Sequence, residues 1–503
     1  MTKTIVLGLD GANWALLSPW LEDGRLPNIA TLREEGVSAD MESVLPPVTC
    51  PNWRCYSTGK NPGKLGVFWW EKIDTDARTL STPNSRSFKS ANYWDYLNDE
   101  GLTAGVVNLP MTYPPFEVDR FMLAGGPGSE QHDYTHPTEL GGDLDSDGYR
   151  LHPEQPVTRS ADRAAADVID LIDRRLSTFQ ELLKENPVDV AHCTVFYINV
   201  LQHFFWRGDP TRRAWEVIDE HIGAIREGYP DVTLLLMSDH GCKDVDTIFY
   251  ANAWLESKGY LRTTGDAADA VSRLGVNKKA ISKHAHRLNI HGLLTRLAPA
   301  WLTDRIPEDR EGFKREQKLK KIDWERSKAV ASGQGLIYLV DDDPAVRKRL
   351  IADLEALTNG RGEPVAREVL TREEVYDGEF VDEAPQIVFD QRPGVHTSGA
   401  IGSNPIFADA SHWEAENVRT GLFLADGPEV VTDALDGPIS ITDVAPTVLH
   451  SVDCAIPTDL DGAALELFGD REVRTREPIP FESAGGVSGE KVTQRLENLG
   501  YLE

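Results

Sequence analysis

Short, almost continuously apolar runs constrain the fold of this chain more than any other feature of its sequence. Residues 4–9 and 233–237 have no alternation of polar and apolar positions, and residues 188–197 form a third run of similar character. Runs of this kind are typical of strands buried on both faces of a parallel sheet. Amphipathic segments between them, above all residues 160–183, carry apolar residues at steps of three and four. This alternation predicts an α/β fold with a mostly parallel central sheet and helices on both faces.

The alternation of strands and helices is interrupted once. Residues 256–321 have helical patterning, contain Pro299 and Pro307, and show no strand signal. We therefore expect a core whose first part is residues 1–255, a helical insertion at 256–321, and a second part of the core at 322–465. Residues 466–503 are expected to form a polar C-terminal tail.

Charge limits the possible partners. The 81 acidic residues exceed the 52 basic ones, which gives a formal net charge of −29. Such a charge opposes binding to a nucleic-acid duplex or to an anionic membrane. An acidic, lysine-poor composition favours an origin in a salt-loving microbe such as a halophilic archaeon, where salt screens the self-repulsion. The alternative is an ordinary acidic cytosolic protein.

The sequence also bears on location. It has no run of about 18 apolar residues, so no transmembrane segment is expected. The N-terminus enters a strand at once and shows no secretory signal. Five cysteines without a CxxC pair indicate reduced thiols, and we expect a cytoplasmic protein. The sequence does not indicate an oligomeric state.

Thr49 lies where the chain enters a helix. Residues 44–53 predict a strand end, a proline-stiffened turn and then a short helix, in which Pro51 suits the first turn. Backbone N–H groups and the positive end of the helix dipole would surround the Thr49 hydroxyl and could hold a phosphate there. An alcohol becomes a good nucleophile only when a neighbouring group removes or neutralises its proton. Because no base lies near Thr49 in sequence, a metal is expected to activate the hydroxyl. The alternative is that Thr49 only caps the helix.

Candidate metal ligands follow the predicted strands. They are Asp10, His203, Asp239, His240 and His412. Because the carboxyl ends of parallel strands meet at one edge, these side chains are expected to converge there. Mixed histidine and aspartate ligation suits Zn²⁺, and Mn²⁺ is the alternative. His396 competes with His412 for the last position.

Several motifs resemble those of a known family. They are LDG at 9–11, PPVTCPNW at 46–53, TGKNPG at 58–63, QH at 202–203, SDHG at 238–241, His412 followed by TG at 420–421, DVAPTVL at 443–449, DG at 461–462 and RLENLGYL at 495–502. In order and placement they resemble the alkaline phosphatase superfamily, and within it the type I phosphodiesterase/nucleotide pyrophosphatase branch. The resemblance covers essentially the whole core on both sides of the insertion.

The resemblance implies a two-metal site. One divalent ion would be held by Asp10, Asp239 and His240, with Thr49 as the bound nucleophile. The other would be held by His203, by His412 and by the residue at 199. His412 is preferred over His396 because the strand that begins near Gly421 follows it at the family's distance.

This chain departs from the family's pattern at residue 199. The family has an aspartate there, whereas this chain has Asn199. An amide oxygen can reach a metal but carries no charge. We therefore expect weaker affinity at the second position, or occupancy completed by the substrate phosphate.

The function expected from the resemblance is metal-dependent hydrolysis of phosphate esters, either diesters or pyrophosphates, in a small phosphorylated substrate. Thr49 would attack phosphorus, and water would hydrolyse the phosphothreonine. Asn52, one turn into the helix, would donate to a phosphate oxygen or only cap the turn. The alternatives are a phosphomonoesterase or sulfatase-like hydrolase, a phospho-group transferase, and a degenerate non-catalytic binder of a phosphate ligand, which Asn199 favours. The substrate itself is not specified by the sequence.

Overall fold

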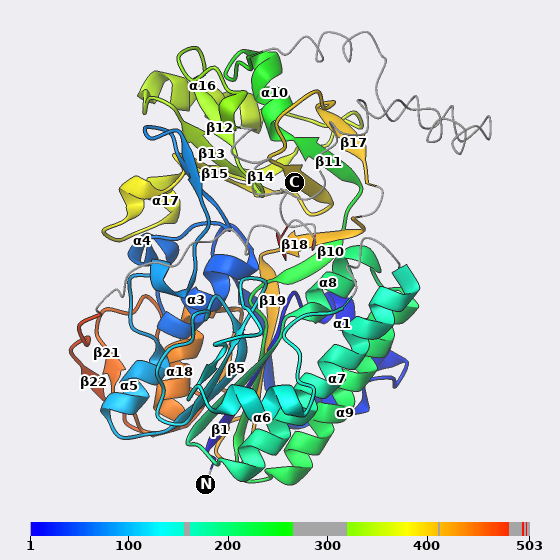
Figure 1. Cartoon of the computed structure of the whole chain (residues 1–503), viewed down its shortest axis with the longest axis vertical. Helices are drawn as coiled ribbons and strands as arrows, with labels where there is room; N and C mark the ends of the chain where they lie inside the picture. The colour runs from blue at the N-terminus through cyan, green and yellow to red at the C-terminus, as the bar shows by residue number, and fades with distance from the viewer. Residues whose placement is uncertain are drawn as a thin grey trace.

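A large sheet covered by helices forms the body of the protein, and smaller sheets lie above one of its edges (Figure 1). The structure is a computed structural model that describes residues 2–154, 161–264, 319–410, 413–481, 495, 496 and 499. Most of the predicted insertion at 256–321, and most of the predicted tail beyond residue 481, therefore lie outside the described residues. Within the described ranges, no helix combines the length and the apolar character needed to span a bilayer.

The central sheet has nine strands. In spatial order they are β20 (Ile439–Ser440), β2 (Val37–Glu42), β19 (Thr420–Asp426), β9 (Thr233–Met237), β1 (Thr4–Leu9), β8 (Val190–Val195), β5 (Ala104–Pro110), β6 (Phe121–Gly125) and β7 (Thr135–His136). Strand β1 pairs in parallel with β8 and β9, and β5 pairs in parallel with β8 and β6. Antiparallel pairing occurs where β19 meets β9 and β2 and where β6 meets β7. The predicted mostly parallel sheet is confirmed.

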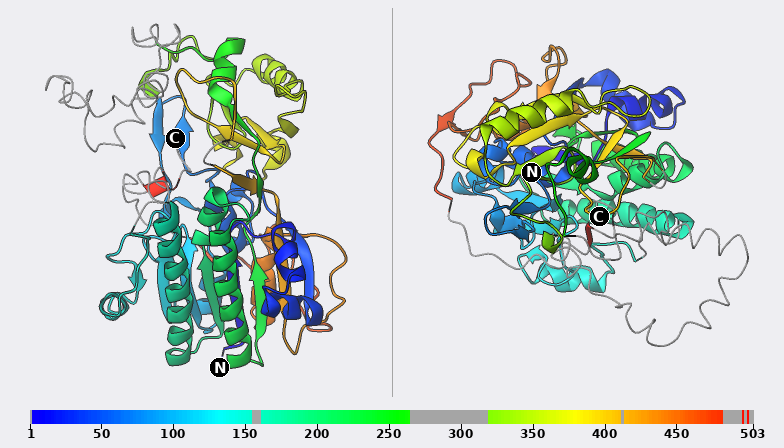
Figure 2. Two further views of the ribbon diagram at one scale, coloured as in Figure 1. Left: turned by 90° about the vertical axis from the view of Figure 1, so that its right-hand side faces the viewer. Right: turned by 90° about the horizontal axis from the view of Figure 1, so that it is seen from above.

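Helices cover both faces of this sheet (Figure 2). One face packs against α1 (Trp14–Glu22), α2 (Pro27–Glu35), α7 (Ala161–Glu185), α8 (Tyr197–Phe204) and α9 (Asp209–Gly228). The other packs against α3 (Thr49–Thr58), α5 (Tyr93–Asp99) and α18 (Val444–Ser451). Strand β1 alternates between the two cores, since Val6 belongs to one while Ile5 and Leu7 belong to the other. Burial on both faces explains why its sequence is continuously apolar.

The register of the central strands brings their polar ends together. Leu9 on β1 is level with Val195 on β8, and Gly8 is level with Met237 on β9. The residues that follow these strands therefore share one edge of the sheet. Strand β19 begins at the same edge, because a Cβ placed on Gly421 would lie 2.3 Å from Ser238 Oγ.

Two smaller sheets stand above that edge. One consists of β16 (Val395–Ser398), β11 (Thr247–Tyr250) and β17 (Phe407–Asp409); the other consists of β12 (Ala329–Ala331), β13 (Leu336–Leu339), β15 (Ile387–Gln391) and β14 (Ala366–Thr371). Helices α10 (Ala251–Lys258) and α16 (Pro344–Glu355) pack on them, and the ribbon of β10 (Gly241–Asp244) and β18 (Ala415–Val418) lies between them and the body (Figure 1).

This arrangement differs from the one expected for residues 322–465. Of the strands in this range, β19 belongs to the central sheet, whereas β12, β13, β14 and β15 do not extend it. Strands β12, β13, β14 and β15 pair antiparallel with one another and bury a core of their own. A short apolar run predicts a strand but does not indicate which other strand it pairs with. The sequence pattern alone therefore did not separate the four-stranded sheet from the central sheet.

Shorter elements complete the described chain. They are α4 (Pro62–Leu65), β3 (Lys72–Asp74), β4 (Thr79–Ser81), α6 (Leu140–Ser146), α17 (Arg372–Val375), β21 (Ile456–Pro457) and β22 (Thr475–Arg476), with 3₁₀ turns at Ser85–Ser87, Val381–Glu383 and Ile441–Asp443.

Candidate active site

Thr49 is the first residue of α3, and its hydroxyl faces the polar edge of the central sheet. The N-cap of α3 is Val48, so Thr49 is not the capping residue. The Thr49 hydroxyl donates to Asp10 Oδ1 at 3.3 Å and lies 3.4 Å from His240 Nε2. All three side chains are fully buried. The structure thus gives the hydroxyl two polar neighbours that are distant in sequence.

Asn52 stabilises the turn that presents Thr49. Its Nδ2 donates to the carbonyls of Pro46 and Val48, both at 2.9 Å, and its Oδ1 accepts from Val44 N at 3.0 Å. All of these bonds join α3 to the turn that precedes it. A contact between Asn52 and a phosphate oxygen stays a prediction, because in this structure both amide hydrogens already have acceptors.

Asp10, Asp239 and His240 form the candidate cation site. One ligand atom of each lies within 4.8 Å of the others, and no part of the three side chains is exposed. Asp239 Oδ1 accepts from Gly11 N at 3.2 Å. Asp239 Oδ2 accepts no hydrogen bond from the described residues and lies 3.2 Å from His240 Nε2. Because a buried carboxylate oxygen normally has a partner, this atom is free for an additional ligand.

Burial shifts the pKa values of all three groups in this cluster. It raises the pKa of Asp10 to about 8, although hydrogen bonds from Trp53, Thr49 and Asn199 oppose the shift. Burial, and then the charge of Asp10, raise the pKa of Asp239 well above its ordinary value. Burial lowers the pKa of His240 to about 3, so its ring stays neutral. Two buried carboxyl groups beside a neutral imidazole form a set that a divalent cation would stabilise.

Two contacts fix the orientation of these candidate ligands. Trp53 Nε1 donates to Asp10 Oδ2 at 2.8 Å, and His240 Nδ1 bonds to the carbonyl of Gly241 at 2.9 Å. A histidine that bonds through Nδ1 presents Nε2 to a metal. No local sequence pattern indicated the role of Trp53 beyond its place in the motif at 46–53.

The residues expected at a second cation position are only partly described. Asn199 and His203 both lie on α8 and are buried, whereas His412 lies outside the described residues. His203 Nδ1 bonds to the carbonyl of Ala415 at 2.7 Å, and its ring stacks on Trp413 with the centroids 4.0 Å apart. The second set thus stays a prediction.

A third residue lies beside Asn199 that sequence reasoning missed. Asn417 on β18 is 1% exposed, and its Oδ1 accepts from Asn199 Nδ2 at 3.4 Å. The pairing of β18 with β10, in which Asn417 is level with Cys242, positions it there. This pairing joins segments about 175 residues apart, so no local pattern could have indicated it.

His396, the competitor of His412, is bound to a buried carboxylate. Its Nδ1 bonds to Glu416 Oε2, and its ring lies 5.6 Å from that of Trp413. Glu416 Oε1 also accepts from Gln334 Nε2 at 2.6 Å and from Asn417 N at 2.8 Å. Although burial opposes it, the neighbouring His396 holds the pKa of Glu416 below its ordinary value. Glu416 therefore joins the upper sheets to the edge of the site, and the sequence did not single it out.

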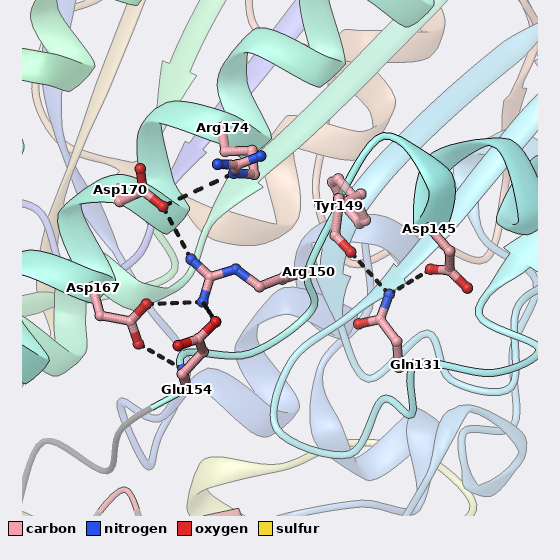
Figure 3. Close-up of a pocket in the computed structure, with 9 residues that line it drawn as sticks. Gln131, Asp145, Tyr149, Arg150, Glu154, Asp167, Asp170 and Arg174 are labelled. Atoms are coloured by element: carbon pink, nitrogen blue, oxygen red, sulfur yellow. Dashed lines mark hydrogen bonds and ion pairs between the residues drawn. The ribbon is translucent and has the colours of Figure 1, made fainter.

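A separate open pocket of about 690 Å³ lies on the surface near α6 and α7 (Figure 3). Its central cation, Arg150, is paired with Asp167 at 2.8 Å and with Asp170 at 3.0 Å. On the other side, Gln131 donates to Asp145 Oδ1 at 2.7 Å. Arg150 and Arg174, the two arginines among the described residues that line this pocket, are both paired with carboxylates, so neither is free to bind a phosphate.

Comparisons with known proteins show the family of this chain. Residues 4–413 match the family model described as "Type I phosphodiesterase / nucleotide pyrophosphatase". No match was found among curated proteins.

Solved structures share the fold. The chain is similar to phosphonoacetate hydrolase from Sinorhizobium meliloti in complex with phosphonoformate, at 15% identity and a TM-score of 0.56, over 90% of this chain and 95% of that one. It is also similar to an inactive form of a murine ectonucleotide pyrophosphatase/phosphodiesterase in complex with AMP, at 12% identity and a TM-score of 0.52, over 92% and 98% of the two chains. At these identities the likeness concerns the fold.

Proposed function

The chain belongs to the type I phosphodiesterase/nucleotide pyrophosphatase family and is a hydrolase of that class, and we propose that it cleaves phosphate esters with Thr49 as the nucleophile. The single observation that carries the proposal is the contact of a helix-terminal hydroxyl with a buried cluster of two carboxyl groups and an imidazole. Such a hydroxyl is activated when a neighbouring cation or base stabilises its deprotonated form.

The cluster fits a divalent cation. Asp239 Oδ2 has no hydrogen-bond donor among the described residues, and His240 Nε2 is directed at the carboxylates by the bond of Nδ1 to Gly241. When bound there by Asp10, Asp239 and His240, the ion would supply positive charge that favours an ionised hydroxyl and a developing phosphoryl charge. Histidine and aspartate ligands suit Zn²⁺ best, with Mn²⁺ as the alternative.

The chain's own groups supply the rest of the reaction. The Thr49 Oγ1–phosphorus bond forms as the ester phosphorus–oxygen bond breaks, and the hydroxyl proton leaves towards Asp10 Oδ1, which already accepts its hydrogen bond. The N-terminus of α3 favours the negative charge of the phosphoryl group. Water then cleaves the phosphothreonine and restores the hydroxyl.

The substrate class is a small phosphorylated molecule, and within it we propose a phosphodiester or a pyrophosphate. Bis-p-nitrophenyl phosphate compared with p-nitrophenyl phosphate separates a diesterase from a phosphomonoesterase. The second cation that the family resemblance implies, held by Asn199, His203 and His412, stays a prediction.

The test is the pair of variants Thr49→Ala and Thr58→Ala, assayed on bis-p-nitrophenyl phosphate with Zn²⁺ or Mn²⁺. Thr58 is the matched control, because it lies at the other end of α3, is 2% exposed, and its hydroxyl only donates to Arg54 O at 2.7 Å. We expect Thr49→Ala to abolish turnover with an unchanged far-UV circular dichroism spectrum, and Thr58→Ala to keep it. Turnover retained in Thr49→Ala removes Thr49 from the mechanism. A wild-type chain that binds phosphate but turns over neither ester is the degenerate binder.

A further inference from the structure

The amide side chains beside the cation cluster form a hydrogen-bonded relay of fixed direction. Trp215 Nε1 donates to Gln202 Oε1 at 3.3 Å. Gln202 Nε2 then donates to Asn199 Oδ1 at 3.2 Å and to the carbonyl of Gly11 at 3.1 Å. An indole N–H can only donate and a backbone carbonyl can only accept, so these two groups set which end of Gln202 carries oxygen and which carries nitrogen.

The orientation of the Gln202 amide determines the orientations of the Asn199 and Asn417 amides. Since Asn199 Oδ1 accepts from Gln202, Asn199 Nδ2 faces the other way, where it donates to Asn417 Oδ1 at 3.4 Å. A hydrogen bond from the same side chain also reaches Asp10. Asn417 Oδ1 is thereby occupied, and its Nδ2 hydrogens are left as the end of the relay.

Asn417 Nδ2 is a buried donor with no acceptor among the residues that the structure describes. The side chain is 1% exposed. Leaving such a group unpaired is energetically costly, so a donor of this kind points to an acceptor supplied from outside the chain. It is two hydrogen bonds away from Asp10, through Asn199.

The same groups do not fit a second cation. Asn199 Oδ1 is engaged by Gln202, and Asn417 presents nitrogen rather than oxygen. The nearby carboxylate of Glu416 is held by Gln334, His396 and the Asn417 backbone. The described members of this position, Asn199 and His203, therefore contribute an amide and an imidazole and no carboxylate, whereas the cluster of Asp10 and Asp239 contributes two carboxyl groups. A divalent ion beside an amide and an imidazole would lack the charge compensation that its burial requires.

Gly11 shows how closely the relay is fitted. Its φ is 69°, and a Cβ placed on it would lie 2.2 Å from Asn199 Oδ1 and 2.7 Å from Gln202 Nε2. Only glycine lets the backbone after Asp10 approach these amides. The relay is thus built into the turn that carries the first cation ligand.

We propose that Asn417 is a substrate-binding residue whose side-chain N–H groups bind a phosphoryl oxygen at the position where the family resemblance implies a second cation, so that the chain holds one divalent ion at the site. The inference rests on the proposed function, because the phosphoryl group is the substrate part next to Thr49. It adds an anion-binding amide to a site whose cation is held by Asp10, Asp239 and His240.

Two measurements that need no turnover test the proposal. Metal content is determined by mass spectrometry after dialysis against Zn²⁺ or Mn²⁺, and binding of inorganic phosphate to the metal-loaded chain is determined by calorimetry. We expect one ion per wild-type chain. We expect Asn417→Leu to keep that ion and to lower phosphate affinity about tenfold or more, since it removes a hydrogen bond to a charged group.

Further variants keep the test decisive if Asn417→Leu does not fold. Asn417→Asp places a carboxylate at the same site and is expected to weaken phosphate binding at least as much. Asn359→Asp is its matched control, because Asn359 is a buried amide that follows α16 and donates to Thr247 on β11 at 3.4 Å, in the upper sheets; it should leave phosphate affinity unchanged. The double variant Asn199→Asp/Asn417→His should gain a second ion per chain.

Three outcomes would overturn the proposal. They are two tightly bound ions in the wild type, loss of metal from Asn417→Leu, and phosphate affinity that is unchanged in both Asn417 variants. A chain that binds phosphate through Asn417 yet hydrolyses no ester would instead contradict the proposed function and leave this inference standing.

Discussion

Replacing Trp53 by phenylalanine should weaken metal binding without touching a candidate ligand. Trp53 Nε1 donates to Asp10 Oδ2 at 2.8 Å, and neither side chain has any exposed surface. That bond favours the ionised form of Asp10, whose pKa burial raises to about 8. Without the indole N–H the pKa of Asp10 rises further, and protons compete more strongly with the metal.

The size of the effect follows from the kind of bond. A hydrogen bond donated to a charged group contributes about 1.5–3 kcal/mol, and losing an outer partner of a metal ligand typically costs about 10- to 100-fold in affinity. We therefore expect the dissociation constant for Zn²⁺ or Mn²⁺ to rise by about 10- to 100-fold near neutral pH. The loss should shrink as pH rises, because the competing proton leaves Asp10.

Calorimetric titration of the metal-free chain at several pH values measures this change. Trp94→Phe is the matched control, since Trp94 is also fully buried in the same core but its Nε1 has no partner among the described residues. Both variants create a similar small cavity, so a general loss of stability would appear in both. Wild-type affinity in Trp53→Phe, or an equal loss of affinity in Trp94→Phe, would refute the reasoning.

Two further predictions concern stability. Burial raises the pKa of Asp10 from 3.8 to about 8, so the metal-free folded chain holds a proton that the unfolded chain releases between these values, and its unfolding free energy falls as pH rises through that window. The melting temperature of the protein kept metal-free with a chelator should thus drop between about pH 5 and about pH 8, and it should drop less in Asp10→Asn. An equal dependence of melting temperature on pH in the two proteins would contradict this. If the net charge of −29 is a salt adaptation, melting temperature should increase between about 0.1 M and about 2 M KCl, and a flat or falling trend would count against it.

The sequence by itself determined the elements that carry the candidate site. Continuous apolar runs predicted the buried strands β1 and β9. Asp10 and Asp239 are polar residues just after these strands, and because the strands are parallel, the two side chains lie at the same edge of the sheet. A proline turn before a short helix placed Thr49 at the start of α3. These inferences succeed because strand burial and helix entry are set by neighbours within about ten residues along the chain.

Tertiary structure alone decided how the site is completed. The pairing of β18 with β10 brings Asn417 beside Asn199, and the packing of α3 against β1 brings the indole of Trp53 to Asp10. It also decided that β13 and β15 form a separate sheet above the site. Such contacts depend on which strands and side chains meet across tens to hundreds of residues. A hydrogen bond between two buried side chains produces no periodic pattern in the sequence from which it could be predicted.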